Sequence, residues 1–190
     1  MENKLTQEDS LKLITKMIST AKGNISQGSF HMLLWGWVTI TVSISHFLLA
    51  TFKVIRHPEI VWLLMVPTLI VSLGVGFTRG RKSTVSTHLD GIYMWIWLAL
   101  TINMSLMIYY LNGKWDIISS MVLIMAGYAT FLSGKLIKFK PMIYGGIAFW
   151  LWSLVAYFAG SYYGLLITAG AIFTGYVIPG LMLRKRKNEL

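Results

Sequence analysis

Six long apolar stretches dominate the chain, and short polar segments separate them. They cover roughly residues 30–52, 60–78, 91–111, 116–134, 142–160 and 163–183, so each has 19 to 23 residues. A helix of about 20 residues crosses a hydrocarbon layer of about 30 Å. The interiors of the stretches contain no Asp, Glu, Lys or Arg, and backbone polar groups in lipid must be satisfied within the protein. The pattern therefore predicts an all-α membrane bundle of six transmembrane helices.

The composition agrees with this prediction. Hydrophobic residues make up 55% of the chain and charged residues 13%, with a mean hydropathy of +0.62. Soluble domains average about 25% charged residues, so an ordinary soluble domain is excluded. The chain has no cysteine, which excludes thiol catalysis, cysteine-ligated zinc and a disulfide-stapled secreted module.

Basic residues gather on one side of the predicted spans. Fourteen of the 17 Lys and Arg residues precede the first span or follow the second, fourth or sixth, and the other three are Lys53, Arg56 and Lys114. The positive-inside rule then places both termini in the cytoplasm. We interpret the net charge of +10 as a topology signal that favours anionic membrane lipids as partners, and we expect no nucleic-acid binding.

A tryptophan pattern repeats along the odd-numbered spans. Each of these spans has a Trp-x-Trp pair near its start, and the pairs are Trp35/Trp37, Trp95/Trp97 and Trp150/Trp152. We interpret the chain as three repeated parallel hairpins. Side chains at i and i+2 point about 200° apart on a helix, so one of each pair must face protein if the other faces lipid. Packing with interfacial anchoring explains the pairs, and a shared aromatic-lined cavity is the alternative.

Small residues recur every four positions in the even-numbered spans. The three series are Ser72, Gly76 and Gly80, then Ala126, Thr130 and Gly134, then Ala171 and Gly175. Small residues at this spacing let helix backbones approach in lipid. We therefore expect the even spans to form the inner layer, with the odd spans outside them or at a subunit interface. Pro67 and Pro179 lie inside even spans and can kink them.

The residues before the first span predict a separate amphipathic helix over 6–22. Its apolar positions recur at steps of three and four, at Ile14, Met17, Ile18, Ala21 and Ile25. We expect Gly23, Asn24 and Gly28 to end it. This gives a cytoplasmic helix and linker (1–28), a six-helix membrane domain (29–184) and a basic tail (185–190). The helix either lies on the inner membrane surface or docks against the bundle, a second subunit or a cytoplasmic partner.

Of the four histidines, only His46 lies well inside a predicted span, and Asn103 lies close to the middle of the third span. The candidate intramembrane polar site consists of His46, Thr101, Asn103 and Ser105. Ionisable and polar groups in lipid are candidates for function, although a neutral histidine and interhelical hydrogen bonds explain them equally well.

The sequence lacks the motifs of common catalytic sites. It has no phosphate loop, no His-Glu-x-x-His and no Gly-x-Ser-x-Gly. His57/Glu59 and His88/Asp90 are predicted on opposite sides of the membrane, so they cannot share a metal ion. We expect no catalytic residues, no cofactor and no metal site.

The segment Leu5-Thr6-Gln7-Glu8-Asp9-Ser10-Leu11, the helix that follows it and Leu34-Trp35-Gly36-Trp37 resemble small uncharacterised membrane proteins of Bacteroidota-type bacteria. The resemblance covers the first fifth of the chain best and implies a bacterial inner-membrane protein. In plan, three short hairpins are also similar to HdeD-type membrane proteins, although the Trp-x-Trp pairs and the amino-terminal helix depart from them.

These patterns leave three classes of function open. The first is a non-enzymatic membrane protein that acts through lipid, a partner or self-association as a homo-oligomer. The second is a small oligomeric transporter or channel for a neutral or weakly polar solute, and the third is a lipid-modifying enzyme. The missing catalytic motifs and the small-residue faces favour the first class.

Overall fold

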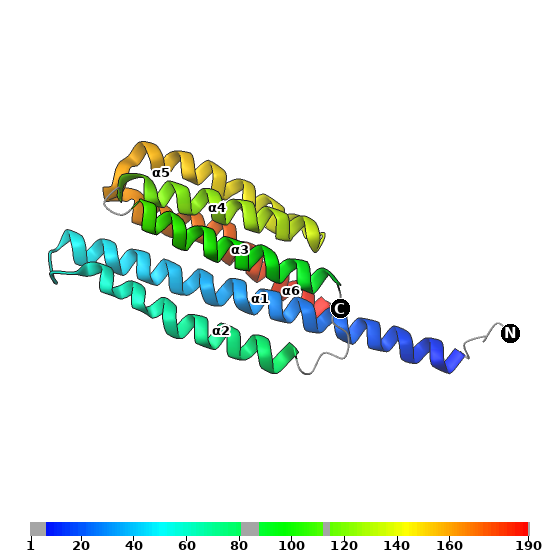
Figure 1. Cartoon of the computed structure of the whole chain (residues 1–190). Helices are drawn as coiled ribbons and strands as arrows, with labels where there is room; N and C mark the ends of the chain where they lie inside the picture. Colours follow the sequence, from blue (N-terminus) through cyan, green and yellow to red (C-terminus); the bar gives the residue numbers. More distant parts are fainter. Residues whose placement is uncertain (1–6, 81–87, 112–114, 190) are drawn as a thin grey trace.

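The computed structural model describes residues 7–80, 88–111 and 115–189, and this part of the chain is a bundle of helices (Figure 1). Six segments are long and apolar enough to cross a membrane: Gly28–Thr51, Pro58–Thr78, Gly91–Tyr110, Ile117–Leu136, Lys140–Gly160 and Tyr162–Lys185. The prediction of a six-span helical membrane bundle is confirmed. The chain is a multi-pass membrane protein.

The spans are built from helices of three kinds, in the following order along the chain. They are α1 (Gln7–Thr51), the 3-10 helix η1 (Pro58–Leu64), α2 (Met65–Gly80), α3 (His88–Tyr110), α4 (Trp115–Leu136), α5 (Lys140–Ile172), the π-helix η2 (Phe173–Val177) and α6 (Ile178–Glu189). Successive spans run in opposite directions, which gives the bundle two ends (Figure 1). We call the end with the turn 137–139 and Arg184 the basic end, and the end with the loop 52–57 and Gly160 the far end.

α1 corrects the expected organisation of the amino-terminal segment. Gly23, Asn24 and Gly28 all lie inside this helix and do not end it, because one glycine lowers helix stability by only about 1 kcal/mol. Gly28 lies beside α6: a Cβ there would be in van der Waals contact with Leu183, at 3.4 Å from its Cδ2. The amphipathic segment is therefore continuous with the first span and extends beyond the basic end (Figure 1), with no linker between them.

The core lies where α4 and the first half of α5 pack together. Glycines let the two backbones approach: a Cβ on Gly134 would lie 2.7 Å from the backbone nitrogen of Ile143, and one on Gly146 would lie 2.7 Å from that of Phe131. Large side chains fill the space around this crossing and are almost fully buried, among them Leu123, Met142 and Phe149. The last span completes the core, and α1 packs along α5 and α6.

The expectation of an inner layer of even spans is correct for two spans and wrong for the third. In the fourth and sixth spans 44% and 50% of the residues are buried, and their small residues are among them. In the second span only 6% of the residues are buried. α2 packs mainly against α1 and η1, and a Cβ on Gly76 would meet nothing within 4 Å. The fifth, odd-numbered span takes the inner place, 33% buried. The surroundings of Gly80 lie outside the described part.

A single glycine makes the turn between the last two spans. Gly160 has φ 71° and ψ −177°, a region that only glycine occupies readily. The segment labelled α5 contains this turn, so it consists of two helical arms on either side of Gly160. The sequence predicts the turn at 161–162, one residue further along the chain.

The two intramembrane prolines have different effects. The ring of Pro179 is incompatible with the usual helical position of the carbonyl four residues earlier, and that carbonyl, of Gly175, lies in the wider turn of η2. α5 closely approaches it, since a Cβ on Gly145 would lie 2.6 Å from the oxygen of Gly175. Pro67 lies in the first turn of α2, directly after the 3-10 helix η1.

We expect Gly145→Val to destabilise the bundle strongly. The new side chain would overlap a backbone carbonyl, which cannot rotate away, and overpacking of a core typically lowers the free energy of unfolding by about 1–3 kcal/mol. Gly74→Ala is the control, because a Cβ there meets nothing within 4 Å and alanine favours a helix. Thermal unfolding of the detergent-purified variants measures the difference. Equal melting temperatures would contradict the close approach of α5 to η2.

Candidate functional site

His46 lies near the far end of α1 and bonds to the following helix. Trp62 Nε1 of η1 donates a 2.9 Å hydrogen bond to His46 Nδ1, and the two rings stand edge to face. The accepting nitrogen carries no proton in this geometry. The bond thus joins the first two spans, which is the ordinary structural role of a partly buried histidine.

The other three candidate polar residues lie on the exposed surface of α3. Each donates to a carbonyl of its own helix four residues earlier: Thr101 to Trp97, Asn103 to Ala99 and Ser105 to Thr101. α3 packs chiefly against α4, whereas the partner of His46 is on η1. The described chain therefore does not bring these residues and His46 into a common pocket.

The first two tryptophan pairs divide their members between protein and the exposed surface. Trp35 donates to Ser72 of α2 at 3.2 Å, whereas Trp37 is 51% exposed, although its ring also contacts that of Phe173 in η2. In the second pair Trp97 contacts the ring of Tyr176, whereas Trp95 is 64% exposed. The helical geometry of i and i+2 positions explains both divisions.

Both members of the third pair face protein, because α5 lies inside the bundle. Trp150 donates to the carbonyl of Ile124 on α4 at 3.2 Å, and Trp152 donates to Thr174 of η2 at 3.0 Å. The three pairs thus meet different surroundings in spite of their common spacing.

Several tryptophan contacts converge on η2, a feature that the sequence analysis missed. Tyr176 is 8% exposed and its ring contacts Trp97 of α3 and Phe149 of α5. Gly36 of α1 completes the junction, since a Cβ there would lie 3.0 Å from Val177. The proline four residues after Gly175 was the available signal for an irregular turn. Rings and hydroxyls at this junction provide packing and no acid–base pair.

A second missed feature joins α1 to α2 on the same helix face as Trp35. Ser72 Oγ lies 2.9 Å from His31 Nδ1 and also accepts the Trp35 bond. His31 and Trp35 are four residues apart, so they share one face of α1. That spacing could have identified the pair as a polar contact with the neighbouring span.

Metal-ligating side chains are sparse in the described part of the chain. No group of three or more His, Cys, Asp or Glu residues lies together there. His57 of the exposed far-end loop and Glu59 of η1 form a 2.9 Å pair, and a zinc site normally needs at least three protein ligands. These two residues alone do not form one.

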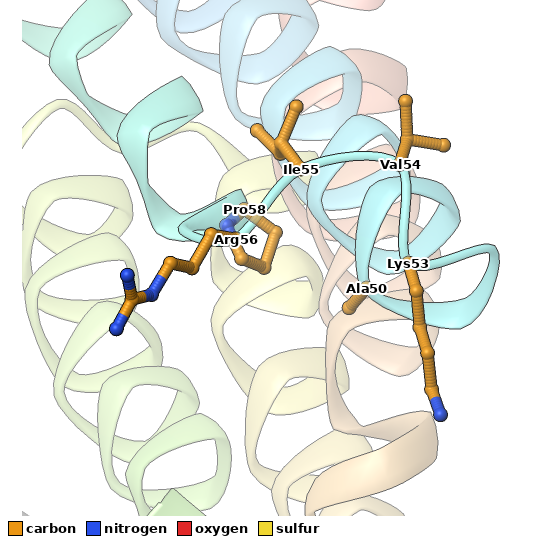
Figure 2. A pocket seen from close by; sticks show the side chains of 6 residues that line it. All are labelled: Ala50, Lys53, Val54, Ile55, Arg56 and Pro58. Carbon is orange, nitrogen blue, oxygen red and sulfur yellow. The ribbon is translucent and has the colours of Figure 1, made fainter.

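Two surface depressions lie at opposite ends of the bundle. The far-end depression has a volume of about 450 Å³ and is lined by Ala50, Lys53, Val54, Ile55, Arg56 and Pro58. Figure 2 shows its two cations, Lys53 and Arg56, pointing away from each other, so they do not converge on one ligand. The basic-end depression has a volume of about 280 Å³ and is lined by Lys135, Lys140, Ile143 and Tyr144.

Comparison with known proteins gives no site to transfer. No protein-family model, curated protein or solved structure matches the chain. Function must therefore be argued from the arrangement of the residues themselves.

We expect His46→Ala to destabilise the bundle and Asn103→Ala to leave it nearly unchanged. Interhelical hydrogen bonds in membrane proteins average about 0.6 kcal/mol and reach about 1.7 kcal/mol, whereas an exposed, self-bonded Asn contributes less than about 0.5 kcal/mol. Trp62→Phe, which keeps a ring but loses the N–H, should destabilise the bundle by a similar amount to His46→Ala. Thermal unfolding in detergent gives the order. A larger loss in Asn103→Ala than in His46→Ala would show that the α3 side chains have a role beyond their own helix.

Proposed function

We propose that the chain is a non-enzymatic protein of the bacterial cytoplasmic membrane that acts by associating with a second copy of itself in the lipid. The observation that carries this proposal is that α2 and α3 are peripheral and have glycines with no packing neighbour in the described chain. Experiment must distinguish this self-association from association with lipid alone or with a different protein.

The second and third spans are peripheral to the bundle. Each is only 6% buried, and each packs mainly against the other helix of its own hairpin. Most of the surface of α2 and α3 is therefore available to lipid or to another chain.

Glycines lie on this surface without a neighbour. A Cβ on Gly74, Gly76 or Gly91 would meet nothing within 4 Å. Glycine weakens a helix by about 1 kcal/mol relative to alanine, so within one chain these residues lower stability and bring no close packing in return. Helix association in lipid depends on such small residues, because they let backbones approach. Self-association would therefore explain why glycines occupy these positions.

Solute transport, the alternative class, would use a polar path through the bundle. In the described part, the polar side chains of α3 face outward, and His46 bonds to Trp62. No specific observation favours this alternative or a lipid-modifying activity.

We expect Gly76→Leu to weaken self-association by about tenfold or more while leaving the monomer folded. A Cβ on Gly76 would meet nothing within 4 Å, and leucine is a good helix former, but the added side chain would hold a second copy away. Val66→Leu on an already exposed position of the same helix is the matched control. Counting subunits in liposomes at several protein-to-lipid ratios measures association. A wild-type chain that stays monomeric at all ratios would contradict the proposal.

The proposed orientation, with both termini in the cytoplasm, has its own test. The chain contains no cysteine, so single-cysteine variants report one position each. Val54→Cys, in the far-end loop, should react with a membrane-impermeant maleimide on intact cells, and Lys138→Cys at the basic end should react only after permeabilisation. The reverse pattern would invert the topology.

A further inference from the structure

The turn between α4 and α5 is held rigidly at the basic end. Phe139 N–H donates to Gly134 at 2.9 Å, and the Phe139 side chain is buried in the core. Lys138 adopts the left-handed conformation with φ 53°, which directs the chain back into α5. Because Gly134 and Ile143 meet closely, the last turn of α4 and the first turn of α5 stand side by side.

This geometry places two lysines on either side of one hollow. Lys135 ends α4, Lys140 begins α5, and both line the basic-end depression together with Ile143 and Tyr144. The hollow is therefore lined by two basic side chains, a tyrosine and an isoleucine.

Among the residues that the structure describes, no carboxylate neutralises the positive charge of the hollow. No Asp or Glu occurs between Asp116 and Glu189, and neither lysine pairs with a carboxylate among the residues that the structure describes. Lys135 Nζ lies 5.7 Å from the ring of Phe131, a contact that positions the ammonium group without removing its charge. α5 also begins here without a side-chain cap, so the positive end of its dipole adds to the field.

The depth of the hollow corresponds to the headgroup region of a bilayer. The fourth candidate span ends at Leu136 and the fifth begins at Lys140. From Tyr144, an exposed apolar stripe continues along α5 through Ile147 and Leu151, which are spaced three and four residues apart and so share one helix face. An anionic head and an apolar tail would both be accommodated.

We propose that the hollow between Lys135 and Lys140 binds the phosphate headgroup of an anionic phospholipid, with an acyl chain lying along Tyr144, Ile147 and Leu151. Basic pockets between membrane helices at the headgroup level suit such lipids. The site belongs to a single chain, so it does not depend on self-association. The continuous apolar stripe distinguishes a lipid from free phosphate as the ligand.

The test is native mass spectrometry of the full-length protein in neutral detergent, with phosphatidylglycerol added and phosphatidylcholine as the zwitterionic comparison. We expect the double variant Lys135→Gln/Lys140→Gln to reduce phosphatidylglycerol binding by about tenfold. The variant Lys135→Arg/Lys140→Arg should retain binding, because arginine keeps the charge and binds phosphate. The same spectra count subunits, so lipid binding and self-association are read separately.

Two controls remove the same charge elsewhere. Arg184→Gln/Lys185→Gln acts at the same end outside the hollow, and Lys53→Gln/Arg56→Gln acts at the far end. Both should retain the lipid. Unchanged binding in Lys135→Gln/Lys140→Gln, or an equal loss in Arg184→Gln/Lys185→Gln, would overturn the proposal in favour of a diffuse basic rim. Displacement of the lipid by millimolar inorganic phosphate would instead indicate a free-phosphate site.

Discussion

The close crossing of α4 and α5 determines the rest of the arrangement. Gly134 and Gly146 let the two backbones touch, and dispersion contacts between such surfaces replace the hydrophobic drive that lipid removes. The last span packs into the same region through Gly175 against Phe149. Because these three spans occupy the centre, α1 is placed beside them, and α2 and α3 are left with one main helical neighbour each.

This asymmetry connects the two proposals about function. The tightly packed side of the bundle forms a rigid turn whose lysines flank one hollow, whereas the loosely packed side leaves glycines such as Gly76 without contacts. A lipid headgroup suits the first arrangement and a second helix suits the second. Both proposed occupants belong to the membrane.

The membrane spans and one small-residue contact surface were predictable from the sequence. The six spans follow from length and apolarity, since a helix satisfies its backbone hydrogen bonds within its own segment in lipid. The buried series Ala126, Thr130 and Gly134 was predictable as a contact surface. The same spacing failed at Gly76, because a small-residue series permits close packing without specifying which helix, or which chain, supplies the partner. His46 and Asn103 were grouped as one candidate site, yet His46 bonds to Trp62 of η1 whereas Asn103 bonds within α3.

By itself, the sequence determined the number, length and helical nature of the membrane spans, and its basic residues carry the information on orientation. These properties depend on each segment and its solvent, so they can be read locally. Only the tertiary structure decided that α1 continues unbroken through Gly23 and Gly28, that the odd fifth span is central, and that Lys135 and Lys140 flank one hollow. These features depend on which helix faces approach each other, and steric fit between surfaces distant in the chain sets that choice.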